Sequence, residues 1–187
     1  MSPQQALEQA KTKFNNASEH LKSELSKLRT GRATASMLDS VTVVAYGMPT
    51  PLNQVANVSA PEAQLLQITP FDPSNIQAIS SAIRDNQSLG LNPSDDGRVV
   101  RVPIPALTEE RRRDISKQVG AKLEECMITM RNIRHDALDA IDKSKKDKEI
   151  GEDDAKRFAA QIDEAMNKVR AAADQMAKSK EQEIMTV

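Results

Sequence analysis

Apolar residues recur at spacings of three and four along three long segments of the chain, with polar and charged residues between them. This spacing places the apolar side chains on one face of an α-helix, and it predicts helices over roughly residues 3–28, 109–148 and 152–185. The predicted apolar face consists of Leu7, Ala10, Phe14, Ala17, Leu21, Leu25 and Leu28 in the first helix, Ile115, Val119, Leu123, Cys126, Met130, Ile133, Ala137 and either Ala140 or Ile141 in the second, and Phe158, Ile162, Ala165, Val169, Ala172, Met176 and Ile184 in the third.

Residues that start and stop helices flank these segments. Ser2, Pro3 and Gln5 have the identities expected of an N-cap, a first helical residue and a capping-box partner. Gly31 is a candidate stop for the first helix, and Thr108 can cap the second. Because the connection at residues 149–151 is short, we expect the second and third helices to pack antiparallel, with the first helix completing a three-helix bundle.

Residues 31–105 have a different pattern, with short apolar runs separated by proline and glycine. Strands are predicted at Val41–Ala45, Leu65–Thr69 and Val99–Ile104. Leu52–Val58, in which apolar and polar residues alternate only weakly, is a fourth candidate. A helix is expected to start near residues 72–74 and to continue through the isoleucines that follow. The segment therefore predicts a small β/α/β domain.

The predicted fold class is α+β with two domains. Residues 1–30 and 106–187 form a discontinuous three-helix bundle, and residues 31–105 form the inserted β/α/β domain. The chain crosses between the domains twice, and these crossings are either a hinge or two fixed linkers. The residues assigned to the crossings are Thr30, Gly31 and Arg32 in the first and Pro103, Ile104 and Pro105 in the second.

Composition favours a folded protein without a disulfide framework or a membrane span. Aromatic residues make up 2% of the chain, which suits the thin core of a helix bundle better than the walls of a compact enzyme pocket. Cys126 is the single cysteine, and no apolar run reaches the length of about 18 residues that a spanning helix needs. The N-terminus lacks the features of a signal peptide, so a cytoplasmic location is expected, although a mature organellar protein without its transit peptide would give the same sequence pattern.

The net charge of −1 gives no overall basic excess, so any surface that binds nucleic acid has to be local. The strongest candidate is the pair Arg131 and Arg134, which lie three residues apart on one edge of the predicted second helix, with Arg113 and Gly120 toward the same side. Guanidinium groups on a rigid helix are well suited to phosphates. The alternative is a solvated face in which Asp136 and Asp139 pair locally with the arginines.

Motifs for catalysis, nucleotide binding or metal binding are absent from the sequence. No glycine-rich phosphate loop or Cys/His cluster is present. Cys126 lies on the apolar face of the second helix, and Asp153 and Asp154 suit the positive end of the third helix dipole. We therefore expect a protein that works by binding rather than as an enzyme, with no cofactor and no metal.

Several short motifs, in this order and spacing, closely resemble the bacterial ribosome recycling factor family over essentially the whole chain. They are Leu28–Ala33 at the end of the first helix, Tyr46–Leu52 after the first strand, Leu89–Pro93 before the last strand, Arg101–Pro105 and Leu107–Arg112 leading into the second helix, Arg131–Arg134 within it, and Asp147–Ile150 and Glu152–Asp154 around the last turn.

The resemblance implies an L-shaped molecule, with the bundle as its long arm and the β/α/β domain on a flexible elbow. It also implies binding to the post-termination ribosome at the subunit interface, chiefly to large-subunit rRNA, and splitting of the subunits together with elongation factor G, which hydrolyses the GTP. A monomer without membrane association is expected. By motif, the RNA contacts of the family correspond to Arg29, Arg32, Arg111, Arg112, Arg131 and Arg134, with Arg113 and His135 as further candidates.

Two positions depart from the pattern of the family. His135 replaces a second basic residue and is largely neutral near pH 7 unless its pKa is raised, and Gly151 replaces a serine or threonine that would open the third helix. Two other classes of function fit the sequence less well. A helical scaffold that binds other proteins needs a groove, and a bundle that buries its own apolar faces leaves none. An enzyme in the insert needs catalytic residues, and none are found.

Overall fold

The computed structural model describes residues 1–186, which form two compact units. Unit 1 consists of residues 1–29 and 109–186, and unit 2 consists of residues 30–108. The sequence analysis placed the divisions after residues 30 and 105, one residue later and three residues earlier than the limits of these units. Val187, the last residue of the predicted bundle, lies outside the described residues.

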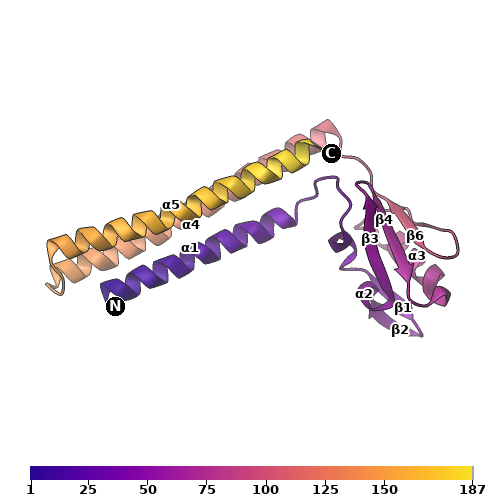
Figure 1. The fold of residues 1–187 in the computed structure, drawn as a ribbon, viewed down its shortest axis with the longest axis horizontal. Helices are drawn as coiled ribbons and strands as arrows, with labels where there is room; N and C mark the ends of the chain where they lie inside the picture. Colours follow the sequence, from indigo (N-terminus) through magenta and orange to yellow (C-terminus); the bar gives the residue numbers. More distant parts are fainter. Residues whose placement is uncertain (187) are drawn as a thin grey trace. The chain divides into compact units, whose positions relative to one another are not determined.

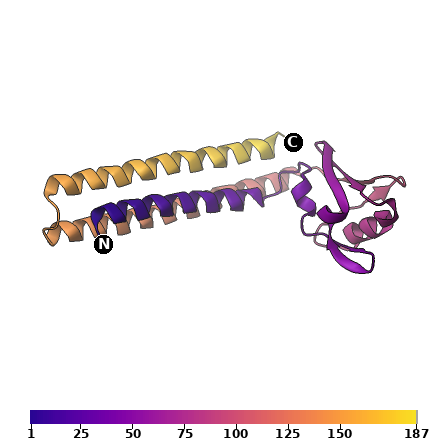
Figure 2. The same cartoon turned by 60° about the horizontal axis from the view of Figure 1, so that its bottom comes forward.

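Unit 1 is a bundle of three long helices, α1 (Pro3–Ser26), α4 (Glu109–Lys146) and α5 (Glu152–Met185). Each helix packs against the other two, and α4 runs antiparallel to both α1 and α5, as Figures 1 and 2 show. The three-helix bundle is therefore confirmed, together with the antiparallel packing of the second and third helices that the short connection predicted. At 1.5 Å per residue, α4 is roughly 57 Å long, so residues on its outer surface can be widely separated and still belong to one rigid element.

The start of α1 has the predicted caps. The Ser2 hydroxyl accepts from the Gln5 backbone N–H at 3.2 Å, and the Ser2 backbone N–H donates to the Gln5 side chain at 3.0 Å. Pro3 occupies the first turn, where its missing N–H costs nothing. At the other end α1 stops at Ser26, four residues before unit 2 begins, so Gly31 does not terminate the helix directly.

The core of unit 1 follows the predicted faces in α1 and α4 but is rotated in α5. Leu7, Ala10, Phe14, Leu21 and Leu25 are buried in α1 as expected. In α5, however, Ala172 is exposed and Ala173 is completely buried. The buried residues of this helix are Ala155, Ile162, Met166, Ala173, Ala177 and Ile184. The predicted face residues Phe158, Val169 and Met176 lie half-buried beside this line, where α5 packs against both α1 and α4.

Unit 2 contains two antiparallel sheets around a single apolar core. A two-stranded sheet pairs β1 (Thr42–Ala45) with β2 (Met48–Pro51), and a four-stranded sheet has the order β3 (Ala56–Glu62), β4 (Leu65–Pro70), β6 (Val100–Pro103), β5 (Ser94–Asp95). Its remaining elements are the 3₁₀ turns η1 (Ala35–Leu38) and η2 (Pro73–Asn75), the single turn α2 (Leu52–Val55) and the helix α3 (Ile76–Asp85).

The register of the larger sheet explains where the core of unit 2 lies. Leu66 pairs with Val102 and Ile68 pairs with Val100, and all four side chains are fully buried. Facing positions in an antiparallel pair project to the same side of the sheet. Helix α3 adds Ile79 and Ile83, which are also fully buried, so the predicted helix after residues 72–74 is confirmed together with the three predicted strands.

The segment Leu52–Val58 is a correction to the sequence analysis. It is one helical turn, α2, followed by the start of β3, rather than a single strand. Leu52 and Val55, three residues apart, both point into the core, which a helical turn allows and an extended strand does not. Strand β2, rich in proline, was not predicted. It is tolerated because it pairs only with β1, so its other edge needs no N–H donors.

The residues assigned to the second crossing are partly integrated into unit 2. Pro103 is the last residue of β6 and pairs with Leu65, and the backbone N–H of Ile104 donates to the Gln64 carbonyl at 2.8 Å. Residues 104–108 have no regular structure before α4 begins. At the first crossing Thr30 and Gly31 are buried, and Gly31 has a left-handed φ of +79°.

Candidate nucleic-acid interface

The arginines singled out from the sequence fall into three places. Arg29 lies three residues after the end of α1, and Arg111 and Arg112 lie in the first turn of α4. These positions are at the same end of the bundle because the two helices are antiparallel (Figure 1). Arg131 and Arg134 lie further along α4. Arg32 belongs to unit 2. The structure therefore groups five of the six arginines on unit 1, in an end group and a mid-helix pair.

The outer edge of α4 carries two arginines in line. Arg113 and Arg131 are 18 residues apart, which is five turns, so they project in the same direction roughly 27 Å from each other. Their side chains are 74% and 59% exposed. Gly120 lies between them on the same side, with nothing within 4 Å of the position its Cβ would take. This edge is therefore a rigid, open surface with cations at fixed intervals.

Both exposed arginines have acidic neighbours on their own helix. Arg113 Nη2 donates to Glu109 Oε1, and Arg131 Nη2 donates to Glu124 Oε1, each at 2.6 Å. Ion pairs this exposed contribute little to stability, because water already solvates both charges well. A phosphate can therefore replace these carboxylates, or bind the same guanidinium beside them, at a low cost in free energy.

Arg134, unlike Arg113 and Arg131, pairs with an acidic residue of another helix. Its Nε donates to Asp163 Oδ1 at 2.6 Å and its Nη2 to Asp163 Oδ2 at 3.4 Å, so the pair connects α4 to α5. The side chain is half-buried, and donation to this carboxylate raises the pKa of Arg134. The local alternative, pairing with Asp136 or Asp139, is wrong for Arg134, because its partner is on a different helix.

His135, the next residue, is a weaker candidate for phosphate contact. Its side chain is 74% exposed, and its Nε2 lies 3.5 Å from Asp139 Oδ2, a contact that is an ion pair only when the imidazole is protonated. Asp139 therefore does pair locally, but with the histidine. The two arginines at the start of α4 also differ in exposure. Arg111 is exposed, whereas Arg112 is half-buried.

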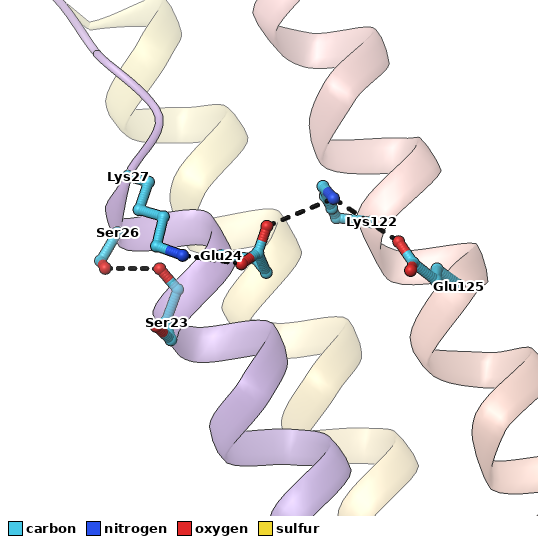
Figure 3. Close-up of polar contacts among 6 residues, drawn as sticks. All are labelled: Ser23, Glu24, Ser26, Lys27, Lys122 and Glu125. Carbon is cyan, nitrogen blue, oxygen red and sulfur yellow. Dashed lines mark hydrogen bonds and ion pairs between the residues drawn. The ribbon is translucent and has the colours of Figure 1, made fainter.

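A polar cluster at the end of α1 was not anticipated from the sequence. Glu24 accepts from Lys27 Nζ at 2.9 Å and lies 3.2 Å from Lys122 Nζ of α4, which also lies 3.6 Å from Glu125 (Figure 3). Lys27 first and Lys122 second lower the pKa of the Glu24 carboxyl. The pair Glu24–Lys27 was visible as a three-residue spacing, but Lys122 is remote in sequence. The cluster fixes the last turn of α1 to α4, shortly before Arg29.

The other polar candidates have structural explanations. Burial raises the pKa of the Cys126 thiol, whose Sγ lies 3.7 Å from the Ala17 carbonyl oxygen, as expected of a core residue. Asp154 pairs with Arg157 at 2.9 Å in the first turns of α5. Within residues 1–186 no group of three or more His, Cys, Asp or Glu side chains is placed to hold a metal ion. None of the helices in this part of the chain is both long and apolar enough to cross a membrane.

The chain is similar to ribosome recycling factors both in sequence and in structure. The family model described as "Ribosome recycling factor" matches residues 21–185. The chain is 49% identical to the ribosome-recycling factor of Halalkalibacterium halodurans over 183 residues, which cover 98% of both chains. It is 45% identical to that of Acidothermus cellulolyticus over 179 residues, which cover 96% of both chains.

Two solved structures resemble the fold over nearly its full length. One is a solution structure of the ribosome recycling factor, with a TM-score of 0.77 and 32% identity, covering 100% of this chain and 99% of that one. The other presents models for the T. thermophilus ribosome recycling factor and the E. coli elongation factor G bound to the E. coli post-termination complex. It has a TM-score of 0.64 and 40% identity, and covers 98% of this chain and 99% of that one.

Proposed function

The chain belongs to the ribosome recycling factor family, and from this premise we propose that it binds the post-termination ribosome and, together with elongation factor G, separates the subunits for reuse. The observation that carries this proposal is the 40% identical relative, which is described with elongation factor G on the post-termination complex. The protein acts as a translation factor rather than an enzyme, and GTP is hydrolysed by its partner. It works in the cytoplasm.

We infer that unit 1 provides the RNA-binding surface, through the end group Arg29, Arg111 and Arg112 and the edge formed by Arg113, Arg131 and Arg134, and that Arg32 adds a contact from unit 2. Guanidinium groups recognise phosphate oxygens by charge and by paired N–H donors, and a long helix holds them at fixed spacing. The exposed carboxylates beside them are weak competitors. The surface contacts rRNA phosphates rather than reading base sequence.

Arg134 provides the sharpest test of this surface. Replacing Arg134 with alanine removes a charge-assisted contact of about 1.5–3 kcal/mol, so ribosome affinity should fall by roughly ten- to a hundredfold. Arg134→Lys should recover only part of the loss, because an ammonium group lacks the planar fork. His135→Ala should have a smaller effect than Arg134→Ala. Equilibrium binding to post-termination ribosomes at several salt concentrations measures all three variants.

Stability has to be measured alongside binding, because Arg134 also joins α4 to α5. A pair this exposed contributes at most about 1 kcal/mol, so the variant should remain folded. Normal ribosome binding by folded Arg134→Ala in moderate salt would show that this edge is not the RNA-facing surface. Loss of the fold would show instead that the residue is mainly structural.

We also infer that the two crossings between the units, at Thr30–Arg32 and near Pro103–Pro105, work as a hinge. Two compact units joined by two short segments support this inference, as does the left-handed backbone at Gly31. Distances between one label on each unit should be broadly distributed in the free protein and narrow on the ribosome. One narrow distance in the free protein would indicate fixed linkers.

A further inference from the structure

The guanidinium of Arg134 is only partly used by its carboxylate partner. The group has five N–H donors, and Asp163 accepts one from Nε at 2.6 Å and one from Nη2 at 3.4 Å. Among residues 1–186, Nη1 of Arg134 has no hydrogen-bond partner. Both N–H groups of Nη1 and the second one of Nη2 therefore remain available on the side of the guanidinium away from Asp163.

The guanidinium group is planar, so a contact along its Nε and Nη2 edge also fixes the direction in which its Nη1 donors point. An arginine side chain on a helix surface has many rotamers, and ordering it on binding reduces affinity. Asp163 lies on α5, which is packed along α4, and its short side chain has few rotamers, so the position of the carboxylate relative to α4 is set by the packing of the two helices. Arg131 has no such anchor, since its acidic partner Glu124 is on its own helix and is 61% exposed.

We propose that Asp163 is a positioning residue for RNA binding, which holds Arg134 so that its Nη1 and Nη2 donors face a phosphate of the ribosomal RNA. This inference rests on the proposed function of the α4 edge. Helix α5 then takes part in RNA binding, although the arginines predicted from the sequence to contact RNA do not lie on this helix. Asp163 itself does not touch the phosphate and acts only through Arg134.

Simple electrostatics predicts the opposite sign, which makes the proposal easy to test. Removing a carboxylate near an RNA-facing surface increases local positive charge, and by charge alone it should tighten binding. If Asp163 instead positions Arg134, its loss should weaken binding even though the surface becomes more basic. The direction of the change therefore separates positioning from competition or repulsion.

The experiment compares the binding of full-length variants to post-termination ribosomes. Asp163→Asn keeps the shape of the side chain but removes the charge, and it should weaken binding roughly three- to tenfold. Asp163→Glu keeps the carboxylate and should recover part of the loss. In an Arg134→Ala background Asp163→Asn should cause no further loss, because the two residues act through one contact.

Two matched controls separate positioning from charge and from bundle stability. Glu164→Gln removes a neighbouring carboxylate of α5 that pairs with Lys168 and not with Arg134, so it should not weaken binding. Glu24→Gln breaks the other cross-helix contact described above, between α1 and α4 (Figure 3), and tests whether loss of such a pair alone affects binding. Unfolding in denaturant confirms that each variant is folded.

The possible outcomes are distinguishable. Weaker binding of Asp163→Asn that disappears in the Arg134→Ala background supports the proposal. Unchanged or tighter binding of Asp163→Asn, with the expected loss for Arg134→Ala, overturns the positioning role alone. The positioning role is also overturned if Glu164→Gln and Glu24→Gln both weaken ribosome binding as much as Asp163→Asn does. Normal binding of Arg134→Ala overturns the proposed function of the α4 edge, and this inference with it.

Discussion

The conformation of Gly31 shows how single residues constrain the junction. Gly31 and Gly47 have nearly the same left-handed φ, +79° and +77°, but different surroundings. A Cβ on Gly31 would lie 3.0 Å from Leu107 Cγ, whereas nothing lies within 4 Å of one on Gly47. The two glycines therefore separate backbone strain from steric crowding.

Replacing each glycine with alanine gives a specific prediction for unit 2. Both variants should lose about 1–2 kcal/mol of stability because alanine disfavours the left-handed region. Gly31→Ala should lose more, since the Leu107 side chain has to shift as well. The free energy of unfolding of the two variants in denaturant measures the difference. Equal losses would mean that Leu107 moves aside without cost.

Some residue-level features of the candidate site could be predicted and others could not. The alignment of Arg131 with Arg113 follows from helical geometry alone. The partner of Arg134 could not be inferred, because Asp163 comes close only through the packing of α4 against α5. The same holds for Lys122, which reaches Glu24 from another helix.

At the scale of elements, long periodic patterns were predictive and short ones were not. The three helices appeared with their limits displaced by no more than two residues, because many apolar positions define each face. The rotation of α5 toward Ala173 was missed, because alanine gives little signal and the choice between Ala172 and Ala173 depends on two neighbouring helices. The turn α2 and strand β2 are each four residues long, so tertiary packing decided their conformation.

The first turn of α5 offers a prediction about helix capping. Gly151 is its N-cap, with φ −81° and ψ 171°, and no side chain caps the free N–H groups. A Cβ there would meet nothing within 4 Å. Gly151→Ser should therefore stabilise unit 1 by a few tenths to about 1 kcal/mol, through a new side-chain cap and a less flexible unfolded chain.

Thermal unfolding of Gly151→Ser and Gly151→Ala tests this prediction. Alanine stiffens the unfolded chain equally but cannot accept a hydrogen bond, so it should stabilise less than serine or should destabilise. If alanine stabilises as much as serine, capping is not the cause. Ribosome binding should be unchanged in both variants, because residue 151 is remote along α4 and α5 from the proposed RNA-binding arginines.

At the scale of the whole molecule, we expect the discontinuous bundle to fold and to bind ribosomes without unit 2. All three helices of unit 1 lie outside residues 31–105, and α1 ends at the same end of the bundle at which α4 begins. A short flexible linker in place of residues 31–105 should therefore leave a helical protein that unfolds cooperatively. It should still bind ribosomes through the arginines of unit 1.

Subunit separation measured by light scattering tests most directly whether the chain splits post-termination ribosomes together with elongation factor G. The full chain with elongation factor G and GTP should dissociate the subunits. The bundle joined by the short linker should bind and leave them associated, because we expect elongation factor G to act through unit 2. Subunit separation no greater than with elongation factor G and GTP alone would show that the chain does not split ribosomes together with this partner.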